Sequence, residues 1–332
     1  MTSFDPKVQR IGFACKIQSA YGVATKELAT HTTTIRWLGS QTRAKAEQRM
    51  WELVQSNVQT LYKQIEWLGT LKPELRMFRI TSDLLPAYTH SDWLAFYFEP
   101  AMTTWLEREL LRCGELARQL DVRLSFHPGQ FCVLASENPQ VVENSIAEFE
   151  YHVDIARYMG YGKQFQDFKI NVHIGGKRGP AGIREAVRSL SREARNCLTI
   201  ENAEFTWGLD HSLELVDTCA LVLDIHHHWI HTGEYIQPDD PRISQICDSW
   251  RGTRPVMHYS VSREDIIVDH DPNTRPDLQQ LKSMGFTNAK LRAHSEMYWN
   301  HACNQWALEH QAWADIMCES KQKNTAAHSL CE

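Results

Sequence analysis

The sequence has no apolar run long enough to cross a membrane, and its first residues, MTSFDPKVQRIGF, lack the charged and then apolar pattern of a signal peptide. It also has no Pro/Gly/Ser-rich linker, no low-complexity tract and no solenoid-type repeat. We therefore expect a cytoplasmic protein without a membrane partner, associated with the nucleoid if its source is bacterial. The 332 residues, 42% of them hydrophobic, can bury one large core.

Cysteine pairs and excess positive charge are lacking as well. The nine cysteines are scattered between Cys15 and Cys331 without a CxxC pair, which excludes a zinc-finger pattern and favours reduced thiols. The formal net charge of −6 argues against a protein that coats nucleic acid, because such binding depends on Lys and Arg. A nuclease is still compatible with this charge, since bound cations are not included in the formal count.

Short apolar runs alternate with longer amphipathic segments along the chain, which is the pattern of parallel βα units. The runs predict eight strands, at residues 10–15, 75–81, 122–127, 168–174, 197–202, 221–226, 255–260 and 289–294. We therefore predict an α/β fold, a single (β/α)8 TIM barrel over residues 1–318 with a metal site at the C-terminal rim of the strands. Residues 319–332 are expected to form a loose tail.

Residues of the kind that bind metals lie at or just after the predicted strand ends. They are His127, His173, Glu201, Asp224, His226, His227, His228, His258, His270 and Glu296. The C-terminal ends of barrel strands meet on one face, so these side chains should surround one pocket. Imidazoles with carboxylates suit Zn, Mn or Fe, and so many ligands exceed the needs of one ion. Two or three ions would support phosphodiester hydrolysis.

The triple histidine leaves one ligand open. Strict strand alternation would place Asp224 and His226 on the same face, but alternation often fails where a strand ends and the chain turns. His226 and His227 therefore both remain candidates at this point.

Several motifs then resemble those of the UV damage endonuclease family, which is related to endonuclease IV-type barrels. The matching strings are FRITSDLLP, SFHPGQFCVL, VVENSIAEFEYH, NVHIGG, TIENAE, LDIHHH and MHYS, in order over residues 10–300. The resemblance implies a DNA repair endonuclease that incises damaged double-stranded DNA 5′ to UV photoproducts and leaves a 3′-hydroxyl. It implies two or three divalent ions, Mn²⁺ first, with Zn²⁺ or Mg²⁺ as alternatives. We expect a monomer without a protein partner.

The resemblance also implies a ligand set. Carried over by position, it consists of His127, His173, Glu201, Asp224, His227, His258, His270 and Glu296. The spacing Asp-x-x-His selects His227 over His226, and the implied catalytic residues are Glu201, His227 and His258. Relatives carry a modified, metal-bridging lysine two residues before the histidine of the seventh strand, but this chain has Val256 there.

Lesion recognition is implied for Gln130 and Phe131, with Phe13 opposite them on the first strand. Wedging flat side chains into a base stack is easier at a damaged step, so a wedge selects lesions. The alternative is that Phe13 and Phe131 are core residues. Contacts to phosphate or sugar are expected from Arg79, Lys177 and Arg178.

Two other functions remain open. Loss of the bridging lysine could leave a catalytically weak protein that binds damaged DNA without cutting it. A sugar isomerase-like barrel would also place His, Glu and Asp at strand ends, but with a more carboxylate-rich site than this histidine-rich one.

Overall fold

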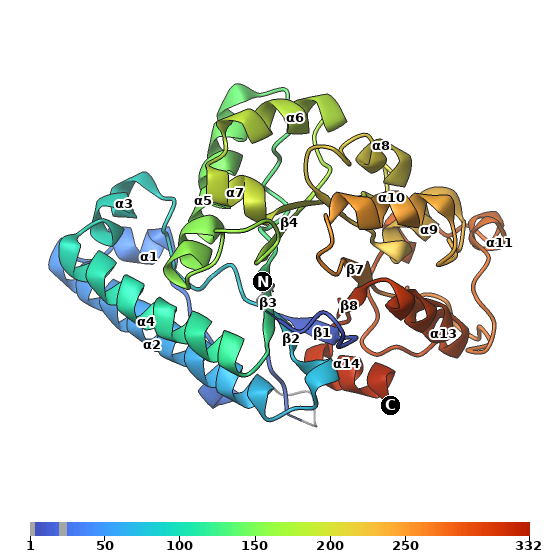
Figure 1. Cartoon of the computed structure of the whole chain (residues 1–332), viewed down its shortest axis with the longest axis horizontal. Coiled ribbons are helices and arrows are strands. Elements are labelled where there is room, and N and C mark those ends of the chain that lie inside the picture. The colour runs from blue at the N-terminus through green and yellow to red at the C-terminus, as the bar shows by residue number, and fades with distance from the viewer. Residues whose placement is uncertain (1–3, 20–24) are drawn as a thin grey trace.

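In the computed structural model, which describes residues 4–19 and 25–332, eight parallel strands form one sheet curled into a barrel (Figure 1). The strands are β1 (Ile11–Ala14), β2 (Met77–Arg79), β3 (Arg123–Phe126), β4 (Lys169–His173), β5 (Leu198–Glu201), β6 (Ala220–Val222), β7 (Val256–Tyr259) and β8 (Asp315–Cys318). Their order is β6-β5-β4-β3-β2-β1-β8-β7. The seam between β6 and β7 is joined by a parallel bridge from Asp224 to His258. The predicted TIM barrel is confirmed.

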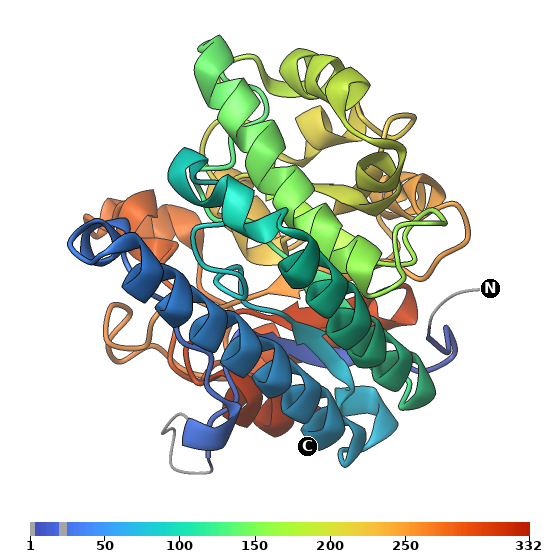
Figure 2. The same cartoon turned by 90° about the vertical axis from the view of Figure 1, so that its left-hand side faces the viewer.

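Helices surround the strands and cover their outer faces (Figure 1). They are α1 (Ile35–Gly39), α2 (Arg43–Gly69), α3 (Ser91–Tyr97), α4 (Pro100–Gln119), α5 (Pro139–Tyr158), α6 (Gly179–Ser189), α7 (Arg192–Cys197), α8 (Leu209–Leu213), α9 (Ile225–Thr232), α10 (Pro241–Ser249), α11 (Leu278–Ser283), α12 (Asn288–Leu291), α13 (His301–Glu309) and α14 (Lys323–Cys331), with 3-10 turns η1 (Lys26–Leu28), η2 (Pro73–Leu75) and η3 (His310–Ala312). Figure 2 shows the long helices α2, α4 and α5 side by side.

Helix α2 illustrates why these segments are helical. Thr42 caps its N-terminus by accepting a hydrogen bond from the backbone N–H of Lys45. Met50, Val54 and Leu61 recur at helical spacing and are buried against the barrel.

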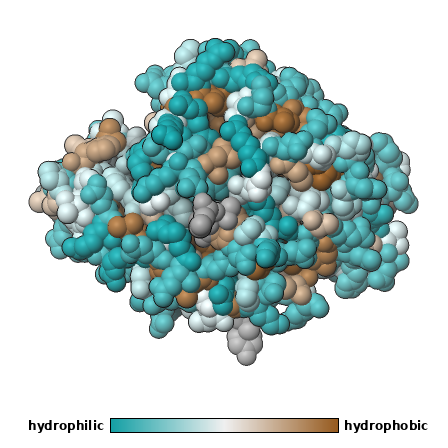
Figure 3. Space-filling view, in the orientation of Figure 1, coloured by the Kyte–Doolittle hydropathy of each residue, from teal (hydrophilic) through white to brown (hydrophobic). Residues whose placement is uncertain are grey.

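Hydrophilic side chains cover most of the face seen in Figure 3, where hydrophobic ones form small, separate patches. Among the described residues, none of the helices is long and apolar enough to cross a membrane.

Seven of the eight predicted strands are confirmed, but the eighth is wrong. The first half of residues 289–294 lies in helix α12, which is capped by Thr287, and the eighth strand is β8, over residues 315–318. Strand β8 contains the buried Asp315, whose carboxylate is 2.7 Å from both Arg123 Nη1 and Arg254 Nε. A charged residue within a run of four does not predict a buried strand from sequence, because its arginine partners come from distant segments.

The C-terminal segment is not loose, contrary to the prediction. After β8 the chain forms α14, which packs against β1 and β8. Asn324 at the start of this helix donates to the backbone O of Gln18 at 2.9 Å and accepts from its N–H at 2.7 Å. Small residues such as Ala326 and Ala327 are fully buried, so the helix lies close to the strands. Residues 319–332 therefore belong to the barrel.

One stability prediction follows from the packing of α4 on α5. A Cβ added at Gly114 of α4 would lie 1.9 Å from the backbone O of Met159, at the end of α5. The Gly114→Ala variant should therefore lose about 2 to 3 kcal/mol of unfolding free energy, measured by urea denaturation. Gly39→Ala is the matched control, because nothing lies within 4 Å of its added Cβ. Equal stability of the two variants would contradict the close approach of α4 and α5.

Candidate metal centre

Glu201, the last residue of β5, lies at the centre of a cluster of histidines. It is fully buried, and its Oε2 is 3.1 Å from Nδ1 of His258 and 3.3 Å from Nε2 of His127. Its Oε1 is 3.3 Å from Nδ1 of His227. These histidines come from β7, from the residue after β3 and from α9. Three segments that are distant in sequence thus meet around one carboxylate, as expected for the C-terminal ends of barrel strands.

Asp224 and His227 are brought together by the start of α9. Asp224 is the N-cap of this helix, and its Oδ1 accepts from the N–H of His227 at 2.7 Å. One helical turn therefore places the His227 ring near the carboxylate, with Nδ1 3.7 Å from Oδ2. His226 instead stacks on Trp229, with ring centroids 5.7 Å apart. The structure brings His227 to Glu201 because the triple histidine is helical, so strand alternation does not apply to it.

Three overlapping groups of side chains have ligand atoms close enough to share a metal ion. His173, at the end of β4, has Nδ1 3.9 Å from Glu201 Oε1, and its ring centroid is 4.8 Å from that of His127. The groups are His127, His173 and Glu201; His127, His258 and Glu319; and Glu201, Asp224 and His258, each with ligand atoms within 4.8 Å of one another. Because the groups share members, they form one continuous cluster.

Glu319 is a member of the cluster that sequence reasoning missed. It follows β8 directly, and its Oε1 is 3.4 Å from Nδ1 of His258. Its carboxylate also forms a salt bridge with Arg79, from the end of β2. The available signal was a carboxylate directly after a short apolar run, DIMCE, which is the same pattern that identified Glu201 in LTIE. The misplaced eighth strand hid this signal.

Two predicted ligands do not join the cluster. Glu296 is exposed, with Oε1 3.1 Å from Nζ of Lys321. His270 lies in the chain between β7 and α11, with Nδ1 2.9 Å from the backbone O of Asp271. The structure therefore does not bring these two predicted ligands to Glu201, and the strand at 289–294 that would have placed Glu296 at the rim does not form. His294 lies near Glu319 instead, with Nδ1 2.8 Å from the backbone O of that residue.

Lys169 of β4 is another neighbour that the sequence did not indicate. Its Nζ crosses the barrel to within 2.9 Å of Nε2 of His258, on the opposite side of that ring from Glu201 and Glu319. Burial lowers the pKa of Lys169 to about 7. Val256, two residues before His258, is a buried apolar residue and offers no ligand atom.

The donor atoms at the centre suit a divalent cation. Within the described part of the chain, buried Glu201 Oε1, Asp224 Oδ2 and His258 Nδ1 have no hydrogen-bond partner. Unpaired buried polar atoms are unfavourable, and here they converge on a common space. Imidazole nitrogens with carboxylate oxygens form a ligand set for Zn or Mn, so the residues present fit bound divalent ions.

The electrostatics of the cluster also favour cation binding. Burial lowers the pKa of His127 to about 3, so this ring is neutral and retains a lone pair. Burial opposes ionisation of Glu201, but the neighbouring His258 and His173 hold the pKa of Glu201 well below its usual value. Burial raises the pKa of Asp224, and the charges of Glu201 and Glu319 add to this effect. Divalent cations would relieve the repulsion among these carboxylates.

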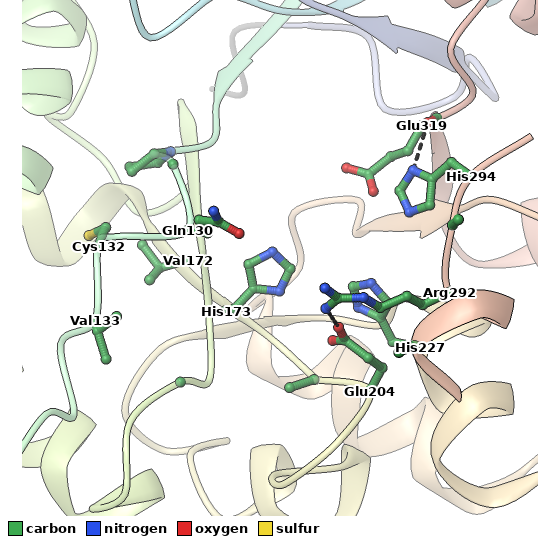
Figure 4. A pocket seen from close by; sticks show the side chains of 16 residues that line it. Gln130, Cys132, Val133, Val172, His173, Glu204, His227, Arg292, His294 and Glu319 are labelled. Atoms are coloured by element: carbon green, nitrogen blue, oxygen red, sulfur yellow. Dashed lines mark hydrogen bonds and ion pairs between the residues drawn. The ribbon is translucent and has the colours of Figure 1, made fainter. Parts of the chain in front are cut away.

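A pocket of about 600 Å³ opens beside the cluster, and six of its lining residues are Gln130, His173, Glu204, His227, Arg292 and Glu319. Figure 4 shows Gln130 on one side, Arg292 and Glu319 on the other, and His173 between them. The predicted probe Phe131 follows Gln130, and its side chain is 84% exposed, which excludes the core alternative.

Phe13 is not a lesion probe. This residue of β1 is fully buried and packs against Phe78, with ring centroids 5.3 Å apart, and against Trp67, at 6.2 Å. Its side chain faces the barrel's helical layer and cannot reach DNA without unfolding this core. The core alternative, left open from the sequence, therefore applies to Phe13 and not to Phe131.

The three predicted phosphate contacts, Arg79, Lys177 and Arg178, do not line this pocket. The Arg79 side chain is only 15% exposed and pairs with Glu319, so it holds a carboxylate of the cluster and is not available to a DNA backbone. Lys177 and Arg178 lie between β4 and α6, where they are exposed and pair with Glu137 and Glu185. Neither residue lines the pocket.

Comparisons with known proteins agree with one another. A family model described as UV-endonuclease UvdE matches residues 9–332. The UV-damage endonuclease of Schizosaccharomyces pombe is 26% identical over 97% of this chain, and the chain spans 50% of that relative. The UV DNA damage endonuclease of Bacillus cereus (strain B4264) is 23% identical over 97% of this chain and 93% of its own length. The crystal structure of SacUVDE has a TM-score of 0.71 at 24% identity, covering 97% and 98% of the two chains.

Proposed function

The chain belongs to the UV-endonuclease UvdE family, and from this premise we propose that it is a DNA repair endonuclease that incises damaged double-stranded DNA 5′ to UV photoproducts and leaves a 3′-hydroxyl. The observation that carries the proposal is the set of three overlapping groups of possible metal ligands, two of which contain Glu201, at the C-terminal rim of the barrel. The two relatives described above are named as a UV-damage endonuclease, in Schizosaccharomyces pombe, and a UV DNA damage endonuclease, in Bacillus cereus.

Two or three divalent ions, Mn²⁺ first, would be held by the cluster. The proposed ligands are His127, His173, Glu201, Asp224, His227, His258 and Glu319, with His294 as a further candidate beside Glu319. When bound, such ions polarise a phosphoryl oxygen and lower the pKa of water, which is the chemistry that phosphodiester hydrolysis requires.

Neighbouring groups of this chain orient the ligand atoms. Asn171 donates a hydrogen bond to Glu201 Oε2, and Thr199 in turn donates to Asn171 Oδ1 at 2.7 Å. Nδ1 of His127 is 2.9 Å from the backbone O of Pro128, so Nε2 of that ring faces Glu201. Such outer contacts select the tautomer and direction of a ligand before the metal binds.

Damage recognition is proposed for Gln130 and Phe131. Gln130 lines the pocket beside the cluster, and the ring of Phe131 is the most exposed large hydrophobic side chain among the described residues. An exposed aromatic ring at the mouth of a phosphodiesterase site can enter a base stack, and the energy of opening that stack is lower at a photoproduct. The pair would thus hold the lesion close to the phosphodiester bond that the cluster is proposed to cut.

The test is a nicking assay on supercoiled plasmid, irradiated or not, with Mn²⁺ or with EDTA. We expect nicks only in irradiated plasmid and only with Mn²⁺. Binding of irradiated duplex without any metal-dependent nicking would overturn the proposal in favour of a catalytically silent damage-binding protein. Isomerisation of a free sugar by the same preparation, without nicking, would favour the sugar isomerase alternative.

A further inference from the structure

The pocket beside the metal centre contains one cationic side chain of the Lys or Arg type. Among its lining residues, which all lie in the described part of the chain, only Arg292 carries such a charge. Arg292 follows α12 and its side chain is 50% exposed. In Figure 4 it lies on the side of the pocket opposite Gln130. The other predicted phosphate contacts are either buried, as for Arg79, or outside the pocket, as for Lys177 and Arg178.

Glu204 holds Arg292 by one edge of its guanidinium. Arg292 Nη1 is 2.6 Å from Glu204 Oε1, and Glu204 is only 13% exposed, so the carboxylate anchors the more mobile side chain. Among the described residues, the bond to Glu204 is the only hydrogen bond that the Arg292 side chain donates, which leaves Nε and Nη2 for another acceptor. The guanidinium carbon also lies 5.2 Å from the ring centroid of Phe205, which supports its plane. A guanidinium has five N–H donors, so it can bind Glu204 and an oxyanion at the same time.

A polyanionic substrate needs such a group here. The pocket is lined by Glu204 and Glu319, and Glu201 pairs with the lining residue His227, so a DNA backbone that enters meets several like charges. A fixed cation at the mouth offsets this repulsion and positions the strand over the cluster. Arginine is suited to this role because its planar fork matches the geometry of phosphate oxygens.

We propose that Arg292, oriented by Glu204 and Phe205, binds a backbone phosphate of the DNA strand that enters this pocket. The proposal rests on the proposed endonuclease function and adds the residue that positions the substrate. Glu204 is a positioning residue, since it acts through Arg292. A phosphate contact of this kind carries no sequence information, so it should strengthen binding to damaged and undamaged duplexes alike.

The experiment measures duplex binding by fluorescence anisotropy in EDTA, at several salt concentrations, with and without a UV photoproduct. Arg292→Met should weaken both complexes roughly tenfold, because a charge-assisted hydrogen bond is lost. The slope of log K against log salt should fall by about 0.9, the value for one phosphate contact. Arg292→Lys should restore the slope but not the full affinity. Arg292→Gln, which can still donate to Glu204, should behave like Arg292→Met and serves if the latter does not fold.

The matched control is Arg184→Met, which removes the same charge. Arg184 lies in α6, is 41% exposed and pairs with Asp217 at 2.8 Å. Asp217 lies in the turn before β6, and so at the end of the barrel opposite the metal centre. We expect its salt slope to equal that of the wild type. If wild-type protein nicks irradiated plasmid but Arg292→Met and Arg292→Gln keep the slope of Arg184→Met, the Arg292 proposal is overturned and the endonuclease stands. If wild-type protein does not nick at all, the proposed function itself fails.

Discussion

Replacing Glu201 with glutamine should lower metal-dependent nicking of irradiated DNA about a thousandfold or more. Glu201 is the carboxylate that His127, His227 and His258 all approach within 3.3 Å, and it belongs to two of the groups that could hold an ion. Glutamine has nearly the same volume and can still accept from Asn171, so the fold should persist. The nicking rate and the metal content after dialysis, by elemental analysis, measure the effect.

The control for Glu201→Gln is its binding to irradiated duplex in EDTA. Glu201 is fully buried, whereas Gln130 and Phe131 lie at the surface, so damage binding should stay close to that of the wild type. Full metal occupancy in the Glu201→Gln protein would show that metal binding does not depend on this carboxylate. A loss of duplex binding equal to the loss of nicking would show that metal and recognition cannot be separated in this way.

The second large expected effect distinguishes Glu319, which lies in the cluster, from Glu296, which the sequence predicted as the ligand in its place. Glu319→Gln should lose bound metal and reduce nicking by at least about a hundredfold, because its carboxylate lies 3.4 Å from His258. It should also lose about 3 kcal/mol of unfolding free energy, because largely buried Arg79 is left without its anion. Glu296→Gln removes an exposed pair with Lys321 and should change stability by less than about 0.5 kcal/mol.

A double variant separates the two roles of Glu319. Adding Arg79→Met to Glu319→Gln removes the unpaired cation together with its partner, so stability should recover while metal binding and nicking do not. Urea denaturation and elemental analysis of the single and double variants measure both quantities. Loss of metal in Glu296→Gln with full retention in Glu319→Gln would reverse the ligand assignment proposed here.

Much of the barrel could be predicted because parallel strands are buried on both faces and are therefore short, continuous apolar runs. Seven of these runs matched strands, and the residues at their ends included His127, His173, Glu201 and His258. The eighth strand could not be recognised because Asp315 interrupts it, and the arginines that neutralise Asp315 come from β3 and from the segment before β7. Local sequence contains no information about such distant partners.

The sequence by itself determined the barrel, the family resemblance and the core of the histidine and carboxylate cluster, because strand ends converge wherever eight βα units close. Only the tertiary structure decided that Glu319 and not Glu296 reaches His258, that Phe13 is core while Phe131 is exposed, and that Arg292 faces the pocket. Each of these depends on which distant segments pack together. Barrel closure between β1, β8 and β7 is such a pairing, and its position in the chain places the last proposed ligand at residue 319, which is 23 residues after the predicted one at 296.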